Sequence, residues 1–381
     1  MKITDYRLYK VKPRWLFLKL LTDEGFYGWG ELISGAKTKT VEAALKEMFE
    51  KISGKDPSSI EDLWQLMYKS FYRGGPILMT VISGIEMALW DIKGHFLNVP
   101  VYELLGGKAR QKIQVYSGVV EETDSDCAAA AVDRMQKGFR AIKLGPTNEY
   151  HYIDSYRKIE KLVNRFAAIR EAVGNDLEIA VDFHGRVHKG MSKLLIHELE
   201  PFHPMFIEEP LLPEHNELLK DLKLSTSIPI ATGERLKTRW EFKHIITSGA
   251  VDIIQPDLSM TGGISETRKI CAMAEAFDIA VAPHAPYGPI NLASTFQLDA
   301  CTPNVVIQEQ STGYIKNLAG DLEDYVKNKE IFDFKDGYVD IPTGPGIGIE
   351  MNEEILEKKS LTDLGWSNPS LRNEDGTITN W

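Results

Sequence analysis

The chain has 381 residues, of which 43% are hydrophobic, and its formal net charge at pH 7 is -11. This length suits two or three domains of average size, or one barrel of about 250 residues with an attached domain. The acidic balance and the lack of a basic stripe argue against nucleic acid as a partner, so an anionic substrate would need a metal ion or a few local cations to hold it.

The cysteines and the apolar segments indicate where the protein works. Cys127, Cys271 and Cys301 are too few and too scattered for a disulfide framework or a thiolate metal site. The N-terminus has no apolar signal segment, and no uncharged apolar run reaches about 18 residues. We therefore expect a cytoplasmic protein that does not bind membranes.

The first hundred residues predict a sheet followed by helices. Alternating runs at 6–11, 16–21 and 26–31, with an Asp-Glu-Gly turn before the last, predict antiparallel strands. Apolar residues at helical spacing follow at 40–52, 59–68 and 80–96. We expect residues 1–112 to form an α+β domain.

From about residue 113, strands and helices alternate. Helices are predicted, for example, at 156–172 and 264–277. Eight strands are expected to begin near Val115, Ala141, Ala180, Phe206, Ile230, Ile253, Val281 and Val306. Their spacing is typical of repeated β-α units and favours a closed parallel barrel over residues 113–320. Because no Gly-x-Gly-x-x-Gly motif opens this region, a dinucleotide-binding sheet is the weaker alternative.

The last segment, residues 321–381, breaks this pattern. Residues 333–341 and 342–350 predict short strands and Gly/Pro turns, and a polar tail follows. The tail contains Trp366 and Trp381, which indicates that it packs on the rest of the chain. We expect the segment to return to the first domain.

The stretch 181–186, Val-Asp-Phe-His-Gly-Arg, places a carboxylate and an imidazole two residues apart. If the stretch is a strand, Asp182 and His184 lie on the same side of it. Acids or histidines also follow the later strands of the predicted barrel. Because the carboxyl ends of barrel strands open on one face, we expect these side chains to converge there.

Three of these acids suit a metal site. Asp182, Glu208 and Glu234 follow successive strands, and without a cation their converging charges would raise one another's pKa. A hard divalent cation such as Mg²⁺ removes this repulsion. Any one of them alone would more often be a surface salt bridge or a helix cap. Glu208 and Glu209 would point to opposite faces of one strand, so only one can be a ligand, and the pattern does not say which.

Two histidines suit acid–base chemistry. His284 follows the strand after the one that Asp257 ends, and adjacent parallel strands lie about 4.8 Å apart. The carboxylate could therefore orient the imidazole as a general base, although a purely structural hydrogen bond is an alternative. His184 could donate a proton beside the metal, or it could be satisfied by a backbone group.

Several motifs in this order resemble the enolase superfamily, and within it the mandelate racemase subgroup. They are 100–107 (Pro-Val-Tyr-Glu-Leu-Leu-Gly-Gly), Asp182-x-His184, Glu208-Glu-Pro, Gly233-Glu234-Arg, Gln255-Pro-Asp257, Pro283-His284 and Gln308-Glu309. The stretches 14–15, 71–79, 88–94, 182–187 and 308–311 are similar to dehydratases of this subgroup that act on D-galactonate. The likeness spans essentially the whole chain.

The resemblance implies the fold and the metal site. The fold would be a (β/α)7β barrel, a modified TIM barrel, with an α+β capping domain built from the N-terminal segment and the C-terminal tail. Asp182, Glu208 and Glu234 match the Mg²⁺ ligands of the superfamily. This match selects Glu208 over Glu209.

The resemblance also implies roles in catalysis. Asp257 and His284 match the pair that removes the C2 proton, and Glu309 matches the acid that hydrogen-bonds the substrate carboxylate. His184 matches the acid that expels the C3 hydroxyl. The related racemases have Lys-x-Lys where this chain reads Lys143-Leu-Gly145, so the second base is missing and elimination fits better than racemisation.

We therefore expect Mg²⁺-dependent dehydration of a sugar acid, D-galactonate, to the 2-keto-3-deoxy acid. The alternatives are another aldonate (gluconate, fuconate, arabinonate or mannonate), epimerisation, and sugar-acid binding without turnover. The stretches 31–37 and 285–287 depart from the galactonate pattern near the distal end of the substrate. We expect the substrate to contact Arg14, Trp15, Lys37, Tyr72 and Lys143, with ordinary packing of the capping domain as the alternative for the first four, and we expect a homo-oligomer.

Overall fold

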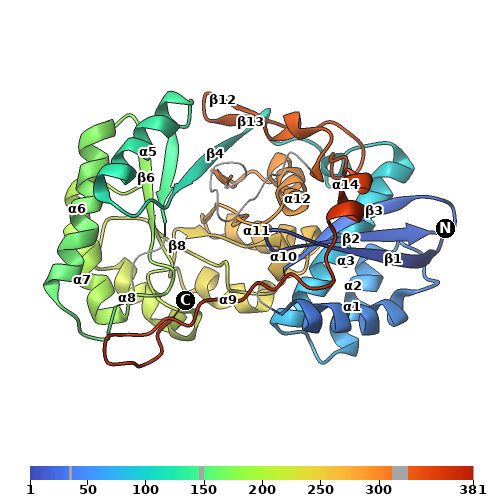
Figure 1. The fold of residues 1–381 in the computed structure, drawn as a ribbon, viewed down its shortest axis with the longest axis horizontal. Helices are drawn as coiled ribbons and strands as arrows, with labels where there is room; N and C mark the ends of the chain where they lie inside the picture. The colour runs from blue at the N-terminus through green and yellow to red at the C-terminus, as the bar shows by residue number, and fades with distance from the viewer. Residues whose placement is uncertain (34–36, 146–149, 311–324, 381) are drawn as a thin grey trace.

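The computed structural model describes residues 1–33, 37–145, 150–310 and 325–380 (Figure 1). The N-terminal part is an antiparallel sheet covered by helices, and a larger part follows in which a parallel sheet alternates with helices. None of the helices in the described part of the chain is long and apolar enough to cross a membrane.

The N-terminal part has the predicted strands and helices. Its antiparallel sheet has the order β1-β2-β3, with a turn after Thr22, as predicted. The elements are β1 (Ile3–Val11), β2 (Trp15–Thr22), β3 (Tyr27–Ile33), α1 (Thr38–Ile52), α2 (Ile60–Ser70), α3 (Pro76–Leu97) and α4 (Val101–Leu104). Helix α3 packs so closely on β3 that a Cβ atom at Gly30 would collide with the backbone of Gly84, and glycine at position 30 permits this contact.

The parallel sheet contains the eight predicted strands. They are β4 (Lys112–Val119), β5 (Ala141–Leu144), β6 (Glu178–Asp182), β7 (Ile207–Glu208), β8 (Ile230–Thr232), β9 (Ile253–Ile254), β10 (Ala280–Val281) and β11 (Gln308–Glu309). Strands β4 to β10 pair in chain order. Val281 of β10 forms a parallel bridge with Val305, and β11 then pairs with β4. The segment from Val305 to Glu309 therefore connects β10 to β4, the last and first strands of the paired series, as a barrel requires.

The barrel interior combines small and large side chains. One buried cluster takes a residue from each strand or from the residues next to it: Tyr116, Ala141, Ala180, Phe206, Ala231, Ile253, Ala282 and Ile307. Alanine beside tyrosine or phenylalanine lets the interior fill without a channel. The barrel is thus a packed core, and ligands have access only at its ends.

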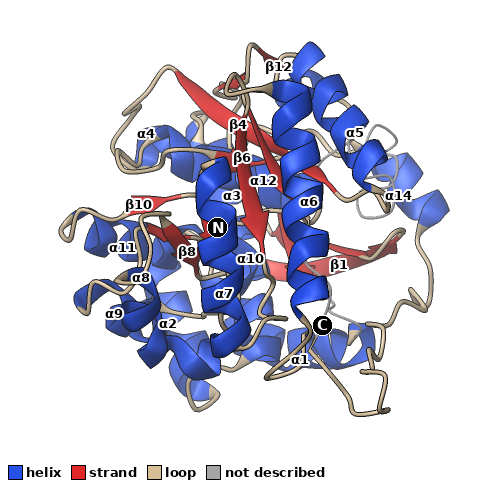
Figure 2. Cartoon of the chain, turned by 90° about the vertical axis from the view of Figure 1, so that its left-hand side faces the viewer, coloured by secondary structure: helices blue, strands red, loops and turns tan. Residues whose placement is uncertain are grey.

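Helices surround the strands on the outside (Figures 1 and 2). They are α5 (Asp124–Gln136), α6 (Tyr156–Val173), α7 (Lys189–Leu199), α8 (Leu219–Lys223), α9 (Arg239–Thr247), α10 (Leu258–Thr261), α11 (Ile264–Glu275) and α12 (Pro289–Ala300). The predicted helices at 156–172 and 264–277 correspond to α6 and α11, whose apolar faces are buried against the sheet. Short 3-10 turns lie at Glu200–Phe202, Pro213–Leu218 and Lys329–Phe332.

The C-terminal segment contacts both parts of the molecule. Strands β12 (Phe334–Lys335) and β13 (Tyr338–Asp340) form a hairpin, and β13 pairs antiparallel with β4 of the barrel. Helix α14 (Glu353–Lys359) instead lies on β1 of the capping domain. The C-terminal segment therefore returns to the capping domain and also pairs with the barrel. Trp381 lies outside the described residues.

Candidate active site

The stretch 181–186 does not continue as a strand beyond Asp182. Strand β6 ends at Asp182, and His184 and Gly185 have φ values of 52° and 63°, so the chain turns there. The turn nevertheless brings the two side chains together. The His184 backbone N–H donates to Asp182 Oδ1 at 2.7 Å, and His184 Nδ1 lies 3.5 Å from Asp182 Oδ2.

Glu208 and Glu209 have different partners. Glu208 is the last residue of β7, and its carboxylate accepts hydrogen bonds from Lys143 Nζ at 2.7 Å and Gln255 Nε2 at 2.6 Å. Glu209 has a φ of 42° and pairs with Arg235, whose Nε lies 2.8 and 3.0 Å from the two carboxylate oxygens. The alternation of a regular strand therefore does not apply to Glu209, and both carboxylates are buried.

His284 and Asp257 form a buried hydrogen-bonded pair, as expected for neighbouring strand ends. His284 Nδ1 lies 2.7 Å from Asp257 Oδ2, while Asp257 Oδ1 accepts from the Ser259 backbone N–H at 2.8 Å. This leaves His284 Nε2 facing the cavity, 3.4 Å from Glu234 Oε2. Burial alone would lower the pKa of His284, but Glu234 and the hydrogen bond to Asp257 raise it to about 10.

Glu234 lies between the two histidines. Its Oε1 atom is 3.9 Å from His184 Nδ1, and its other carboxylate oxygen, Oε2, is 3.4 Å from His284 Nε2. The backbone before it is specific to glycine, because Gly233 has a φ of 145° and a Cβ there would approach the Gln255 backbone nitrogen to 2.9 Å. The turn after β8 therefore aims Glu234 into the barrel mouth.

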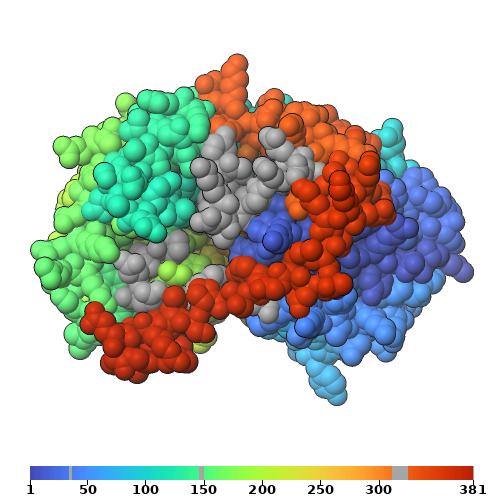
Figure 3. Space-filling model, viewed as in Figure 1, coloured from blue at the N-terminus to red at the C-terminus, as the bar shows by residue number. Residues whose placement is uncertain are grey.

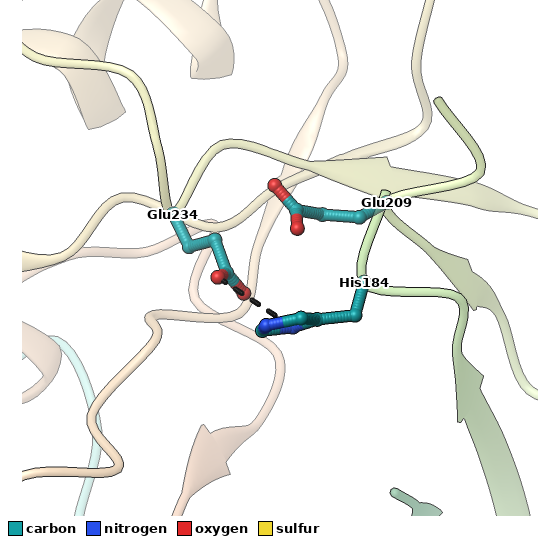
Figure 4. A group of neighbouring side chains, drawn as sticks. All are labelled: His184, Glu209 and Glu234. Carbon is teal, nitrogen blue, oxygen red and sulfur yellow. Dashed lines mark ion pairs between the residues drawn. The ribbon is translucent and has the colours of Figure 1, made fainter. Parts of the chain in front are cut away.

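The acidic side chains fit a divalent cation. Asp182 and Glu208 are register partners on β6 and β7, and burial, opposed by Lys143 but reinforced by Asp182 and Glu234, raises the pKa of Glu208 to about 8. Hard oxygen donors crowded in a buried site suit Mg²⁺ or a similar ion. Among the residues that the structure describes, His184, Glu209 and Glu234 are the group of three whose possible ligand atoms all lie within 4.8 Å of one another (Figure 4).

These groups surround one cavity of about 570 Å³. The predicted residues that line it are Arg14, Trp15, Lys37, Lys143, Asp182, His184, Glu234, His284 and Glu309. Lys143 Nζ lies 3.2 Å from Glu309 Oε1, and Glu309 Oε2 accepts from the Ala285 backbone N–H at 3.0 Å. Glu208 and Asp257 lie behind this lining and hold Lys143 and His284 in place.

Tyr72 does not belong to the cavity, although the sequence suggested that it would. Its side chain is 98% exposed. Tyr72 and the following Arg73 have φ values of 54° and 70°, and this left-handed turn before α3 directs the tyrosine into solvent. The structure instead places Tyr287 against the ring of His284, with centroids 5.8 Å apart.

Several lining residues were not predicted from the sequence. Arg186 and Arg235 lie within or beside the quoted motifs, so their place next to the site has a sequence signal. Lys237, whose Nζ donates to the Arg235 carbonyl at 2.7 Å, and Asn368 of the tail have none. The described residues of the stretch 31–37, which are 31–33 and 37, line the cavity, where the buried Glu31 accepts from the Gly288 backbone N–H at 2.7 Å.

Models of two protein families match the chain. Residues 10–106 match the mandelate racemase/muconate lactonizing enzyme N-terminal domain, and residues 126–355 match the enolase C-terminal domain-like family. Two similar proteins are D-galactonate dehydratases, from Pectobacterium atrosepticum at 49% identity and from Cronobacter sakazakii at 48%, each aligned over the full length of both chains.

Solved structures give the same picture. A Mesorhizobium loti protein assigned as a dehydratase has a TM-score of 0.89 at 34% identity, over 95% of this chain and 99% of its own. An Agrobacterium radiobacter enolase assigned as a galactarate dehydratase, solved with sodium and L-malate bound, has a TM-score of 0.88 at 33% identity over the whole of both chains.

Proposed function

The chain belongs to the mandelate racemase/muconate lactonizing enzyme family of the enolase superfamily, and from this premise we propose that it is a hydro-lyase that dehydrates D-galactonate. One observation supports the proposal above the others. Two imidazoles face Glu234 in one cavity, His284 from 3.4 Å and His184 from 3.9 Å, and the second nitrogen of His284 lies 2.7 Å from the buried carboxylate of Asp257. The site therefore has one imidazole oriented as a base and a second imidazole, beside Asp182, in place to act as an acid.

His284 is the base for the C2 proton. Asp257 accepts the hydrogen bond from Nδ1, and a cation held by Glu234 would offset the carboxylate charge that raises the pKa of His284, so that the neutral ring would direct its Nε2 lone pair into the cavity. A proton α to a carboxylate is far less acidic than an imidazolium, whose ordinary pKa is about 6.5. Transfer therefore needs stabilisation of the negative charge that develops on the substrate carboxylate.

We assign the divalent cation, Mg²⁺, to Asp182, Glu208 and Glu234. The pairing of Asp182 with Glu208 across adjacent strands supports this choice, as does the match to the motif residues, whereas both oxygens of Glu209 face Arg235. When bound, the cation would supply electrostatic stabilisation of the developing charge, worth several kcal/mol. Lys143 and Glu309 would hold the substrate carboxylate at the same end of the cavity.

His184 is the acid for the C3 hydroxyl. Hydroxide is a poor leaving group, so the imidazolium of His184 would transfer its proton as the C3–O bond breaks. The electron pair of the C2–H bond becomes the C2–C3 double bond, and water leaves. The resulting enol tautomerises to the 2-keto-3-deoxy acid. Gly145 stands where a second base would be needed, which supports elimination over epimerisation.

The test is incubation of the purified protein with Mg²⁺ and a set of sugar acids, followed by semicarbazide, which reacts with 2-keto products. The set contains galactonate, gluconate, fuconate, arabinonate, mannonate and the diacid galactarate. We expect product from D-galactonate at the highest kcat/KM. Product from a different acid alone would move the assignment to that substrate, and a C2 epimer without keto acid would make the protein an epimerase.

Other expectations from the sequence stay predictions. They are the cytoplasmic location, the homo-oligomer, and the division of the chain at residues 112 and 320.

A further inference from the structure

The C-terminal tail, residues 361–380, begins on the capping domain. The Leu361 backbone N–H donates to the Lys10 carbonyl of β1 at 2.8 Å, and Lys10 Nζ donates to the Thr362 carbonyl at 3.2 Å. Leu364 is 8% exposed and joins the core of the capping domain. These contacts fix the start of the tail on the capping domain.

The tail then passes in front of the barrel (Figure 3, red). It ends in a small hairpin, in which the Thr379 N–H donates to the Leu371 carbonyl at 3.1 Å. His151, which follows β5, contributes to lowering the pKa of Asp375 in this hairpin, after the larger effect of hydrogen bonds from Thr377. The tail therefore spans from the capping domain to the barrel.

Two tail residues, Trp366 and Asn368, line the catalytic cavity. The Arg14 guanidinium lies over the indole of Trp366, with Arg14 Cζ 5.0 Å from the ring centroid. Tyr287 lies near the same guanidinium, with its centroid 5.2 Å from Arg14 Cζ. A guanidinium contacts aromatic rings through its faces and oxygen atoms through the N–H groups in its plane, so one arginine can make both kinds of contact.

The order of these groups relates them to the substrate. His284 contacts Tyr287, with ring centroids 5.8 Å apart, Tyr287 contacts Arg14, and Arg14 contacts Trp366. Four carbon–carbon bonds carry the end of a six-carbon acid about 5 Å from C2. A substrate whose C2 lies at His284 would thus extend toward Arg14.

We propose that the C-terminal tail forms part of the substrate site: Trp366 holds Arg14 in position for the distal hydroxyls of the sugar acid, and Asn368 hydrogen-bonds the same end. This inference rests on the proposed function and adds a specificity element to it. Arg14 contacts the substrate, while Trp366 acts through Arg14 and is a positioning residue. The tail then determines the length and polarity of the acid that fits, without taking part in the chemistry at C2 and C3.

The experiment compares Trp366→Ala, Trp366→Phe and Asn368→Ala with the wild-type enzyme, in Mg²⁺, on D-galactonate and on a four-carbon 2,3-dihydroxy acid of the same C2 and C3 configuration. For Trp366→Ala we expect KM for galactonate to rise about 10-fold, the size of one lost cation–π contact, with kcat within about threefold. Kinetics on the four-carbon acid should not change. Trp366→Phe should restore most of the affinity.

Two variants are matched controls. Trp240→Ala removes an indole that also stacks on an arginine, Arg239 at 4.4 Å, but lies outside the cavity. Ile378→Ala changes an exposed residue of the tail hairpin. Both should keep the wild-type preference for the six-carbon acid.

Calorimetric binding of D-galactonate to each Mg²⁺-loaded protein separates the two proposals. A wild-type enzyme that turns galactonate over, with Trp366→Ala and Asn368→Ala unchanged in KM and Kd, would overturn the role of the tail and leave the dehydratase intact. An equal loss on both substrates would also overturn it, because that pattern indicates a general structural effect. A wild-type protein that binds galactonate without any turnover would instead refute the dehydratase, and its Kd values would still test the tail.

Discussion

Asp257→Asn should remove most of the activity by changing the tautomer of His284. In the wild-type protein Asp257 Oδ2 lies 2.7 Å from His284 Nδ1, and Asp257 Oδ1 accepts from the Ser259 N–H at 2.8 Å. Asparagine can keep the second contact only if its NH₂ group faces His284. Nδ1 must then accept, so the ring proton moves to Nε2, and the atom that should take the C2 proton is already protonated.

The size of the effect follows from the lost charge. A carboxylate about 4 Å from an imidazolium stabilises it by about 4 kcal/mol at an effective dielectric constant of about 20, which corresponds to roughly a thousandfold in rate. The assay is exchange of the C2 proton with deuterium from D₂O, measured by proton NMR beside keto-acid formation. Asp252→Asn is the control, because Asp252 also accepts a backbone hydrogen bond, from Ile230 at 3.0 Å, but lies outside the cavity. Exchange at the wild-type rate in Asp257→Asn would refute the assignment of His284 as the base.

Three further predictions concern single residues of the site. His184→Asn should lower dehydration by about 10²- to 10⁴-fold while C2 exchange continues, and NMR that finds both lost together would contradict separate acid and base roles. Glu208→Gln should weaken Mg²⁺ binding in calorimetry by more than about 100-fold and Glu209→Gln by less than about 10-fold, so the reverse order would exchange their roles. Burial raises the pKa of Glu31 to about 8 from 4.5. The folded state then binds a proton that the unfolded state releases, so the free energy of unfolding should fall by up to about 5 kcal/mol between pH 4.5 and 8. Denaturant titrations of Glu31→Gln should lack this part of the pH dependence, and identical slopes in both proteins would disprove it.

The fold was largely predictable because its signals are local and periodic. Helical spacing located α6 and α11, and apolar runs located all eight barrel strands. Barrel geometry then explains why residues as distant in sequence as Asp257 and His284 make a 2.7 Å contact: the strand ends open on one face. The same reasoning brought Glu234 and Glu309 to the cavity.

The details of the site were less predictable because they depend on turns and on distant contacts. Alternation along a strand fails at His184 and Glu209, where positive φ angles follow the last paired residue. A similar left-handed turn sends Tyr72 into solvent. Arg14 and Trp366 are 352 positions apart, and neither periodicity nor a motif relates them, so their stacking is visible only in the folded chain.

In the proposed reaction, one base and one acid eliminate water from a sugar acid. The most direct test of this reaction is proton NMR of wild-type enzyme with Mg²⁺ and D-galactonate in D₂O. We expect a 2-keto-3-deoxy acid with one deuterium at C3, because the enol takes a deuteron from the solvent as it becomes the ketone. Recovery of galactonate or of its C2 epimer with deuterium at C2, and no keto acid from any substrate in the set, would contradict it.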